Sequence, residues 1–143
     1  MILYLDTSAL VKLYVSETGS PQVHEWVSAC ELAAVCRIAW AEACAAFARR
    51  ARDVPADAPS LEQAREALAN DWPHYFILEL TETVVARACE YAEVFALRAY
   101  DSVQLAAAST LREATVAEVV FASFDNRLSK AARVTGMGVM PVP

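Results

Sequence analysis

The chain has 143 residues, of which 57% are hydrophobic and 21% charged, with a formal net charge of -6 and a mean hydropathy of +0.28. This length predicts a single domain over residues 1–143, and the scarcity of Gly excludes a disordered chain. No apolar run approaches the roughly 18 residues of a membrane span, and no basic segment precedes the first apolar run, so we expect a cytoplasmic protein without a signal peptide. The negative charge by itself disfavours a nucleic-acid partner.

The first element is an apolar run at residues 2–5, typical of a strand that is buried on both faces of a sheet. The run ends at Asp6. Thr7 and Ser8 are good helix N-caps, and apolar residues then recur at helical spacing up to Tyr14. Asp6 is therefore expected at the carboxyl end of a strand, where open parallel sheets bind their ligands.

Strands and helices are expected to alternate along the rest of the chain. A Ser60–Gln63 pair has the spacing of a capping box and indicates a helix start. The expected helices are 22–29, 37–52, 60–71, 82–97, 100–112 and 126–134, and the expected strands are 32–36, 75–80, 119–124 and 137–140. This alternation predicts a parallel α/β sheet with helices on both faces.

Three acidic residues occupy similar places in this scheme. Asp6 and Asp125 each follow a buried strand, and Asp101 opens a helix. Each of them alone is explained as a helix N-cap. In a doubly wound sheet, however, the first strand is expected to be central, so Asp6 and Asp125 would face each other across one crevice.

Glu42 is not explained as a cap, because it lies in the middle of a helix. The positions three and four residues away hold only Ile and Ala, so its carboxylate emerges from an apolar face, where an unpaired Glu is costly. Pairing with Arg37 or Arg49 remains open as an alternative. Together the four acids predict a site for a hard cation, because oxygen ligands without His or Cys select Mg²⁺ or Mn²⁺ over zinc.

Four segments of the chain resemble, in order, the motif blocks of PIN-domain ribonucleases, and within that family the chain is most similar to VapC-type toxins. The segments are LDTSALVKLY at the start, the helix around Glu42, RAYDSVQLAAA around Asp101 and FASFDNRLSKAA around Asp125. The resemblance implies a PIN-like three-layer fold, with a five-stranded, mainly parallel sheet in the order 3-2-1-4-5. It also implies Mg²⁺- or Mn²⁺-dependent cleavage of RNA, in which Asp6, Glu42, Asp101 and Asp125 are catalytic metal-binding residues supported by Ser8 and Ser123.

The resemblance further implies a cognate antitoxin and a homodimer. We expect the C-terminal segment of the antitoxin to lie in an apolar groove beside the acids and to place an Arg or Lys against them. Part of an unusually large aromatic set should then be exposed as an interface: Trp26, Trp40, Trp72, Tyr75, Phe76 and Phe95. For RNA, a bound metal would reverse the local negative charge. The basic group Arg49, Arg50 and Arg52 is either a phosphate contact or a solvated helix end.

Other readings remain. A non-toxin PIN nuclease of RNA processing and a catalytically inactive PIN-like binding module would share the fold. Phosphoryl chemistry on Asp6, as in haloacid-dehalogenase-like domains, is disfavoured because Ser8 stands where that pattern places a second Asp. The four Cys residues have no zinc-site spacing, and we expect them to be small buried hydrophobes.

Overall fold

The computed structural model describes all residues 1–143, in which five strands alternate with helices. The strands are β1 (Ile2–Leu5), β2 (Leu32–Cys36), β3 (Phe76–Leu78), β4 (Val119–Ala122) and β5 (Gly138–Met140). The α-helices are α1 (Thr7–Val11), α2 (Ser20–Ala29), α3 (Ile38–Asp53), α4 (Ala58–Asp71), α5 (Glu82–Phe95), α6 (Ala99–Ala114) and α7 (Asn126–Val134). Two short 3-10 helices, η1 (Pro55–Asp57) and η2 (Trp72–His74), flank α4.

The five strands form one sheet in the order β3-β2-β1-β4-β5, with β1 at its centre. Every neighbouring pair is parallel, so the predicted strand order is confirmed and the sheet is entirely parallel. Leu5 at the end of β1 pairs with Ala122 at the end of β4. The residues that follow these two strands, including Asp6 and Asp125, therefore emerge side by side at the same edge of the sheet.

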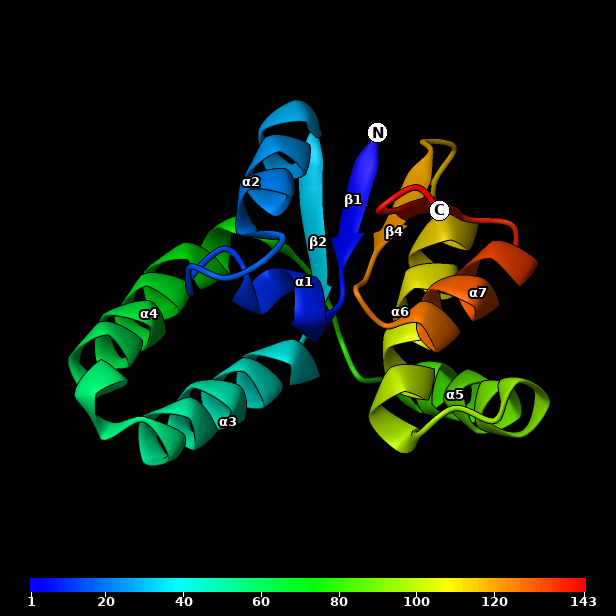
Figure 1. Cartoon of the computed structure of the whole chain (residues 1–143). Coiled ribbons are helices and arrows are strands. Elements are labelled where there is room, and N and C mark those ends of the chain that lie inside the picture. The colour runs from blue at the N-terminus through cyan, green and yellow to red at the C-terminus, as the bar shows by residue number, and fades with distance from the viewer.

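Helices cover both faces of the sheet, as Figure 1 shows, with α1 to α4 on one side and α5 to α7 on the other. Alternate side chains of β1 enter two separate cores. Ile2 and Tyr4 pack with residues of α5, α6 and α7, whereas Leu3 and Leu5 pack with residues of α1 to α4. Burial of the strand on both faces accounts for its continuous apolar sequence and gives the predicted three-layer arrangement.

Helix α3 is anchored by one buried stripe, made of Ala39, Ala43 and Phe47 at four-residue spacing. Glu42 lies next to this stripe and is only partly exposed. The N-terminal end of α3 lies near the carboxyl end of β1, and the helix runs outward from there, so that its C-terminal end lies away from the sheet (Figure 1). The packing stripe thus brings Glu42 to the edge where Asp6 emerges.

Several helix boundaries differ from the expected ones. α1 ends at Val11, before the apolar spacing ends at Tyr14. α4 begins at Ala58, and the Ser60 hydroxyl donates to the Asp57 carbonyl, so the predicted capping box is wrong. α6 begins at Ala99 with Arg98 at the N-cap position, so Asp101 lies in the first turn and is not the cap.

Two composition-based expectations also need correction. Cys89 is exposed, whereas Cys36 is buried and the other two cysteines are half-buried. Of the six aromatic residues proposed as interface candidates, only Phe76 is exposed, at 45%. The others pack on aromatic neighbours: Trp72 on Trp40 and Tyr75, Trp26 on Phe124, and Phe95 on Tyr91. No helix has the length and apolar character needed to cross a bilayer.

Candidate active site

Four acidic side chains reach the carboxyl edge of the sheet from four different elements. Asp6 follows β1, Asp125 follows β4, Glu42 lies near the N-terminal end of α3, and Asp101 lies in the first turn of α6. In Figure 1 the N-terminal ends of α1, α3, α6 and α7 all face this region. The topology therefore gathers acids that are up to 119 residues apart in the sequence, counted from Asp6 to Asp125.

Asp6 is the buried member of the group, with only 4% of its surface exposed. Its Oδ1 accepts hydrogen bonds from the Ser8 hydroxyl at 2.7 Å and the Ala9 amide at 2.9 Å, and its Oδ2 accepts one from the Ser123 hydroxyl at 2.5 Å. Burial raises the pKa of Asp6 to about 6, although these hydrogen bonds oppose the rise. Asp6 is thus both the N-cap of α1 and a carboxyl group whose ionised form is disfavoured by burial.

Ser8 and Ser123 join Asp6 to the loop that carries Asp125. Ser8 Oγ accepts the Phe124 amide at 2.9 Å, and Ser123 Oγ accepts the Asp125 amide at 3.0 Å. Each hydroxyl therefore donates to Asp6 and accepts from the backbone after β4. The two serines therefore connect Asp6 to the backbone of the loop that carries Asp125. A supporting role for them stays a prediction.

Glu42 is held by polar side chains and not by an arginine. Its Oε1 accepts hydrogen bonds from Thr7 Oγ1 and from Gln104 Nε2, both at 2.8 Å. Arg37 instead pairs with Glu79, and no ion pair joins Glu42 to Arg49. The alternative of a structural Glu–Arg pair is therefore wrong, and Glu42 has no cationic partner.

Asp101 and Asp125 share a cavity of about 390 Å³ with Arg98, Asn126 and Arg127, and none of its lining residues is hydrophobic. Burial, together with the charges of Asp125 and Glu42, raises the pKa of Asp101, and Arg98 opposes this rise. Asp125 is exposed, and its Oδ1 caps α7 by accepting the Leu128 amide at 3.0 Å. The cap reading is thus correct for Asp125, but it uses only one of the two carboxylate oxygens.

The four acids supply oxygen donors of the kind that a hard cation takes. A carboxylate offers about four acceptor sites. Oδ2 of Asp6 accepts one hydrogen bond, Oε2 of Glu42 and Oδ2 of Asp125 accept none from the protein, and neither oxygen of Asp101 accepts any. No Lys or Arg forms an ion pair with any of the four. In this arrangement, however, no three Asp, Glu, His or Cys side chains are close enough together to hold a metal ion.

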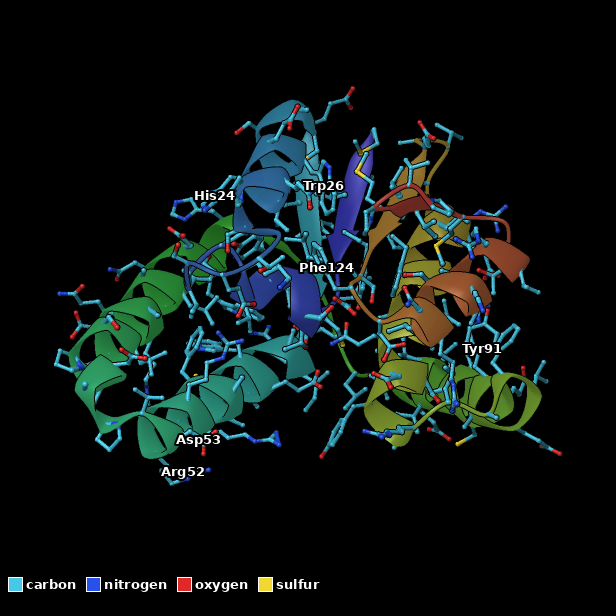
Figure 2. All side chains as sticks on the ribbon, viewed as in Figure 1. His24, Trp26, Arg52, Asp53, Tyr91 and Phe124 are labelled. Carbon is cyan, nitrogen blue, oxygen red and sulfur yellow. The ribbon has the colours of Figure 1, made fainter.

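The basic group at the end of α3 does not belong to this site. Arg50 pairs with Glu17 at 2.6 Å. Arg52 lies ten residues beyond Glu42, about 15 Å along the helix, and Figure 2 shows it with Asp53 at the outer end of α3. Arg49 and Arg52 are exposed, as a solvated helix end would be, whereas Arg50 is half-buried. The arginines that share a cavity with two of the acids are Arg98 and Arg127.

Three residues next to the acids were not singled out from the sequence. Tyr4, fully buried, donates its hydroxyl proton to Gln104 Oε1 at 2.7 Å, and Gln104 Nε2 also donates to Thr7 Oγ1 at 3.1 Å. Burial is the main reason that the pKa of Tyr4 is raised. A signal for Gln104 did exist, because a Gln within the apolar run VQLAAA, one turn after Asp101, is a polar residue at a core position.

The order of strands and the acids at the sheet edge are those of a PIN domain, and the PIN-domain family profile matches residues 3–134. The chain therefore belongs to the PIN-domain family. Within it, Ribonuclease VapC45 from Mycobacterium tuberculosis (strain CDC 1551 / Oshkosh) is 34% identical over 140 residues, which are 98% of this chain and 95% of that protein. At this identity and coverage the chain belongs with the VapC ribonucleases.

Solved structures support the same fold at lower sequence identity. VapC20 of M. tuberculosis, described as a sarcin-ricin loop cleaving toxin, superposes with a TM-score of 0.67 at 16% identity, covering 90% of this chain and 94% of that chain. A chain of a toxin–antitoxin complex from Klebsiella pneumoniae superposes with a TM-score of 0.59 at 17% identity, covering 82% and 83%.

Proposed function

We propose that this ribonuclease is the toxin of a toxin–antitoxin pair and that it cleaves RNA with Mg²⁺ or Mn²⁺ held by Asp6, Glu42, Asp101 and Asp125. The observation that carries the metal dependence is the set of unpaired carboxylates with unused oxygens at one edge of the sheet. Burial, together with the charges of Asp125 and Glu42, raises the pKa of Asp101, and a divalent cation would relieve the repulsion among these carboxylates. Because no three of these side chains are close enough together to hold an ion, we propose that a cation draws them closer together when it binds.

A bound divalent cation would supply Lewis-acid activation of water and neutralise charge on the phosphodiester. The side chains around the acids would hold these carboxylates in place. Ser8 and Ser123 orient Asp6 through two hydroxyl hydrogen bonds, which favour its ionised form against the effect of burial, and Thr7 holds one oxygen of Glu42. Phosphoryl transfer to Asp6 itself is disfavoured, because this carboxylate is almost completely buried and both of its oxygens already accept hydrogen bonds.

We assign the binding of RNA phosphates near the acids to Arg98 and Arg127. Both line the polar cavity of Asp101 and Asp125, and neither forms an ion pair with them. Arg127 also donates to the Ala96 carbonyl at 3.3 Å, which holds the turn before α6. Once a cation neutralises the carboxylates, these two guanidinium groups are free to contact phosphates, the anion that Arg binds best.

The test of the proposed activity is cleavage of labelled RNA by purified protein free of antitoxin. Asp101→Asn and Asp125→Asn should abolish Mg²⁺-dependent cleavage while the far-UV circular dichroism spectrum stays unchanged. Asp53→Asn is the matched control, because it removes the same charge at the outer end of α3, far from the site (Figure 2). Full activity of both Asn variants would reduce Asp101 and Asp125 to structural roles.

The antitoxin is expected in a cleft of about 780 Å³ between the segment after α1 and the α3–α4 pair. Its lining combines apolar side chains such as Leu13 and Leu61 with the charged Arg50 and Asp53. Such a mixed, open cleft suits an extended peptide segment with alternating apolar and charged residues. This cleft contains none of the four acids, but a smaller cavity of about 400 Å³ shares Arg50 with it and is lined by Thr7 and Ser8, which bond Glu42 and Asp6. We propose that the segment continues along this cavity, so that one of its basic side chains reaches the acids and competes with the metal.

A homodimer is the remaining proposal on partners. Large apolar side chains stay exposed around α5 and the segments that flank it: Leu80 at 44%, Val85 at 41%, Val94 at 72% and Tyr100 at 59%. A second copy of the chain is the occupant that we propose for this surface. Val94→Glu should convert a dimer to a monomer in light scattering, whereas Val134→Glu, an equally exposed Val on α7 at 74%, should not.

A further inference from the structure

Gln104 lies at the centre of a closed set of hydrogen bonds that ends on Glu42. Its side chain is 2% exposed. Its Oε1 accepts the Tyr4 hydroxyl at 2.7 Å, and its Nε2 donates to Thr7 Oγ1 at 3.1 Å and to Glu42 Oε1 at 2.8 Å. Both N–H groups of the amide are therefore used, and no other side-chain hydrogen bond joins α6 to α3.

The chemistry of these groups permits only one orientation of the amide. An ionised carboxylate accepts hydrogen bonds but cannot donate them, so Gln104 must turn its NH₂ group to Glu42. Its oxygen then faces Tyr4, whose hydroxyl must donate. A flipped amide would set two oxygens against each other at the Glu42 contact and leave a buried donor facing Tyr4. The buried tyrosine therefore fixes the amide, and the amide fixes Glu42.

The consequence is that the two oxygens of Glu42 are unequal. Oε1 accepts from both Thr7 and Gln104, whereas no group of the protein donates to Oε2. Gln104 also lies one helical turn after Asp101 on α6, so its side chain connects the helix that carries Asp101 to the carboxylate of Glu42.

We propose that Gln104 is a positioning residue of the candidate metal site: it holds Glu42 through Oε1 and so leaves Oε2 as the oxygen available to a divalent cation. This inference rests on the proposed function, because it presupposes that the four acids bind a cation. It assigns to a buried, uncharged residue a share of the metal affinity, in the way that hydrogen bonds to a ligating carboxylate set its orientation.

A merely structural role for Gln104 makes a different prediction, and paired substitutions separate the two. Gln104→Met keeps the shape of the side chain but leaves the Tyr4 hydroxyl buried without a partner, which lowers stability. The double variant Tyr4→Phe/Gln104→Met also removes the buried Tyr4 hydroxyl and so restores the stability lost at that contact, while Thr7 and Glu42 still lack the Gln104 amide. If Gln104 only fills and satisfies the core, the double variant restores every property.

The experiment has two separate measurements, both without RNA. Mn²⁺ binding is followed by electron paramagnetic resonance, and the melting temperature of the metal-free protein is measured in EDTA. Gln104→Met should raise the Mn²⁺ dissociation constant by about 10- to 100-fold and lower the melting temperature. The double variant should recover the melting temperature but keep the weak Mn²⁺ binding. Tyr91→Phe is the matched control, because Tyr91 also gives one hydroxyl hydrogen bond to α6, to Ser109 at 3.0 Å, on the outer side of the molecule (Figure 2).

The outcomes distinguish this inference from the proposed function. Mn²⁺ binding of the double variant within twofold of wild type overturns the role of Gln104 and leaves the metal site intact. The same holds if Tyr91→Phe weakens binding as much as the Gln104 variants do. Absence of Mn²⁺ binding in the wild-type protein overturns the metal site and this inference together. If Gln104→Met does not fold, the double variant alone decides.

Discussion

Burial of Asp6 makes the stability of the metal-free protein fall as the pH rises. Its pKa is raised from the ordinary 3.8 to about 6, so the folded protein keeps a proton at pH values where the unfolded chain has released it. The resulting stabilisation is fully present below pH about 4 and is lost as the pH rises through about 6. At about 1.4 kcal/mol per pKa unit, the whole effect is ~3 kcal/mol, of which roughly half lies between pH 5 and pH 8.

The substitution Asp6→Asn removes this titration, and urea unfolding in EDTA at pH 5 and pH 8 measures it. Asn also disturbs the hydrogen bonds from Ser8 and Ser123, but that cost is the same at both pH values. The difference in unfolding free energy between wild type and Asp6→Asn should therefore fall by about 1.4 kcal/mol from pH 5 to pH 8. For wild type at pH 8, Mn²⁺ at about 100 times its dissociation constant should restore ~2.7 kcal/mol.

Parallel pH profiles for wild type and Asp6→Asn would refute this reasoning, because they would mean that Asp6 titrates alike in the folded and unfolded chains. A difference that grows in favour of wild type with rising pH would contradict it more strongly. It would show that hydrogen bonds outweigh burial and that Asp6 is a stabilised carboxylate without need of a cation.

Three further predictions follow from the packing and the charges. Arg127→Ala should weaken binding to RNA of any sequence. It should also reduce the slope of log affinity against log salt concentration by about one, measured by fluorescence anisotropy; an unchanged slope would exclude a phosphate contact. High Mn²⁺ should weaken inhibition in the purified antitoxin complex if a basic antitoxin residue occupies the place of the cation beside Asp6 and Asp101, whereas complete insensitivity to metal would leave steric blocking as the mechanism. Phe47→Ala, at a fully buried position of α3, should cost about 3–5 kcal/mol in urea unfolding, and a loss below 1 kcal/mol would show that this core is loosely packed.

The main features of the fold were predictable because the central strands are buried on both faces. Ile2–Leu5 and Val119–Ala122 are uninterrupted apolar runs, so their burial, and the emergence of Asp6 and Asp125 just beyond them, follow from the pattern alone. The start of α4 was misplaced because Ser60 and Gln63 suggested a capping box. The informative residue was Pro59, since Pro is favoured in the first turn of a helix and indicates a start before Ser60.

The partners of buried polar groups could not be predicted, because they depend on contacts between distant segments. Glu42 meets Gln104 across 62 residues of sequence, and Tyr4 meets it across 100. The aromatic residues show the same limit: Trp40 and Trp72 stack with ring centroids 4.9 Å apart, which composition cannot distinguish from an exposed interface. Sequence patterns locate acids at strand ends, but packing decides which oxygen of each acid stays free.

RNA cleavage with and without a divalent cation tests the central claim most directly. Wild-type protein, freed of antitoxin, and its Asp101→Asn variant are incubated with one labelled RNA in EDTA, in Mg²⁺ and in Mn²⁺. The account predicts cleavage by wild type in Mg²⁺ or Mn²⁺ only, and none by Asp101→Asn under any condition. Cleavage by wild type in EDTA, or equal cleavage by the variant in Mg²⁺, would contradict it.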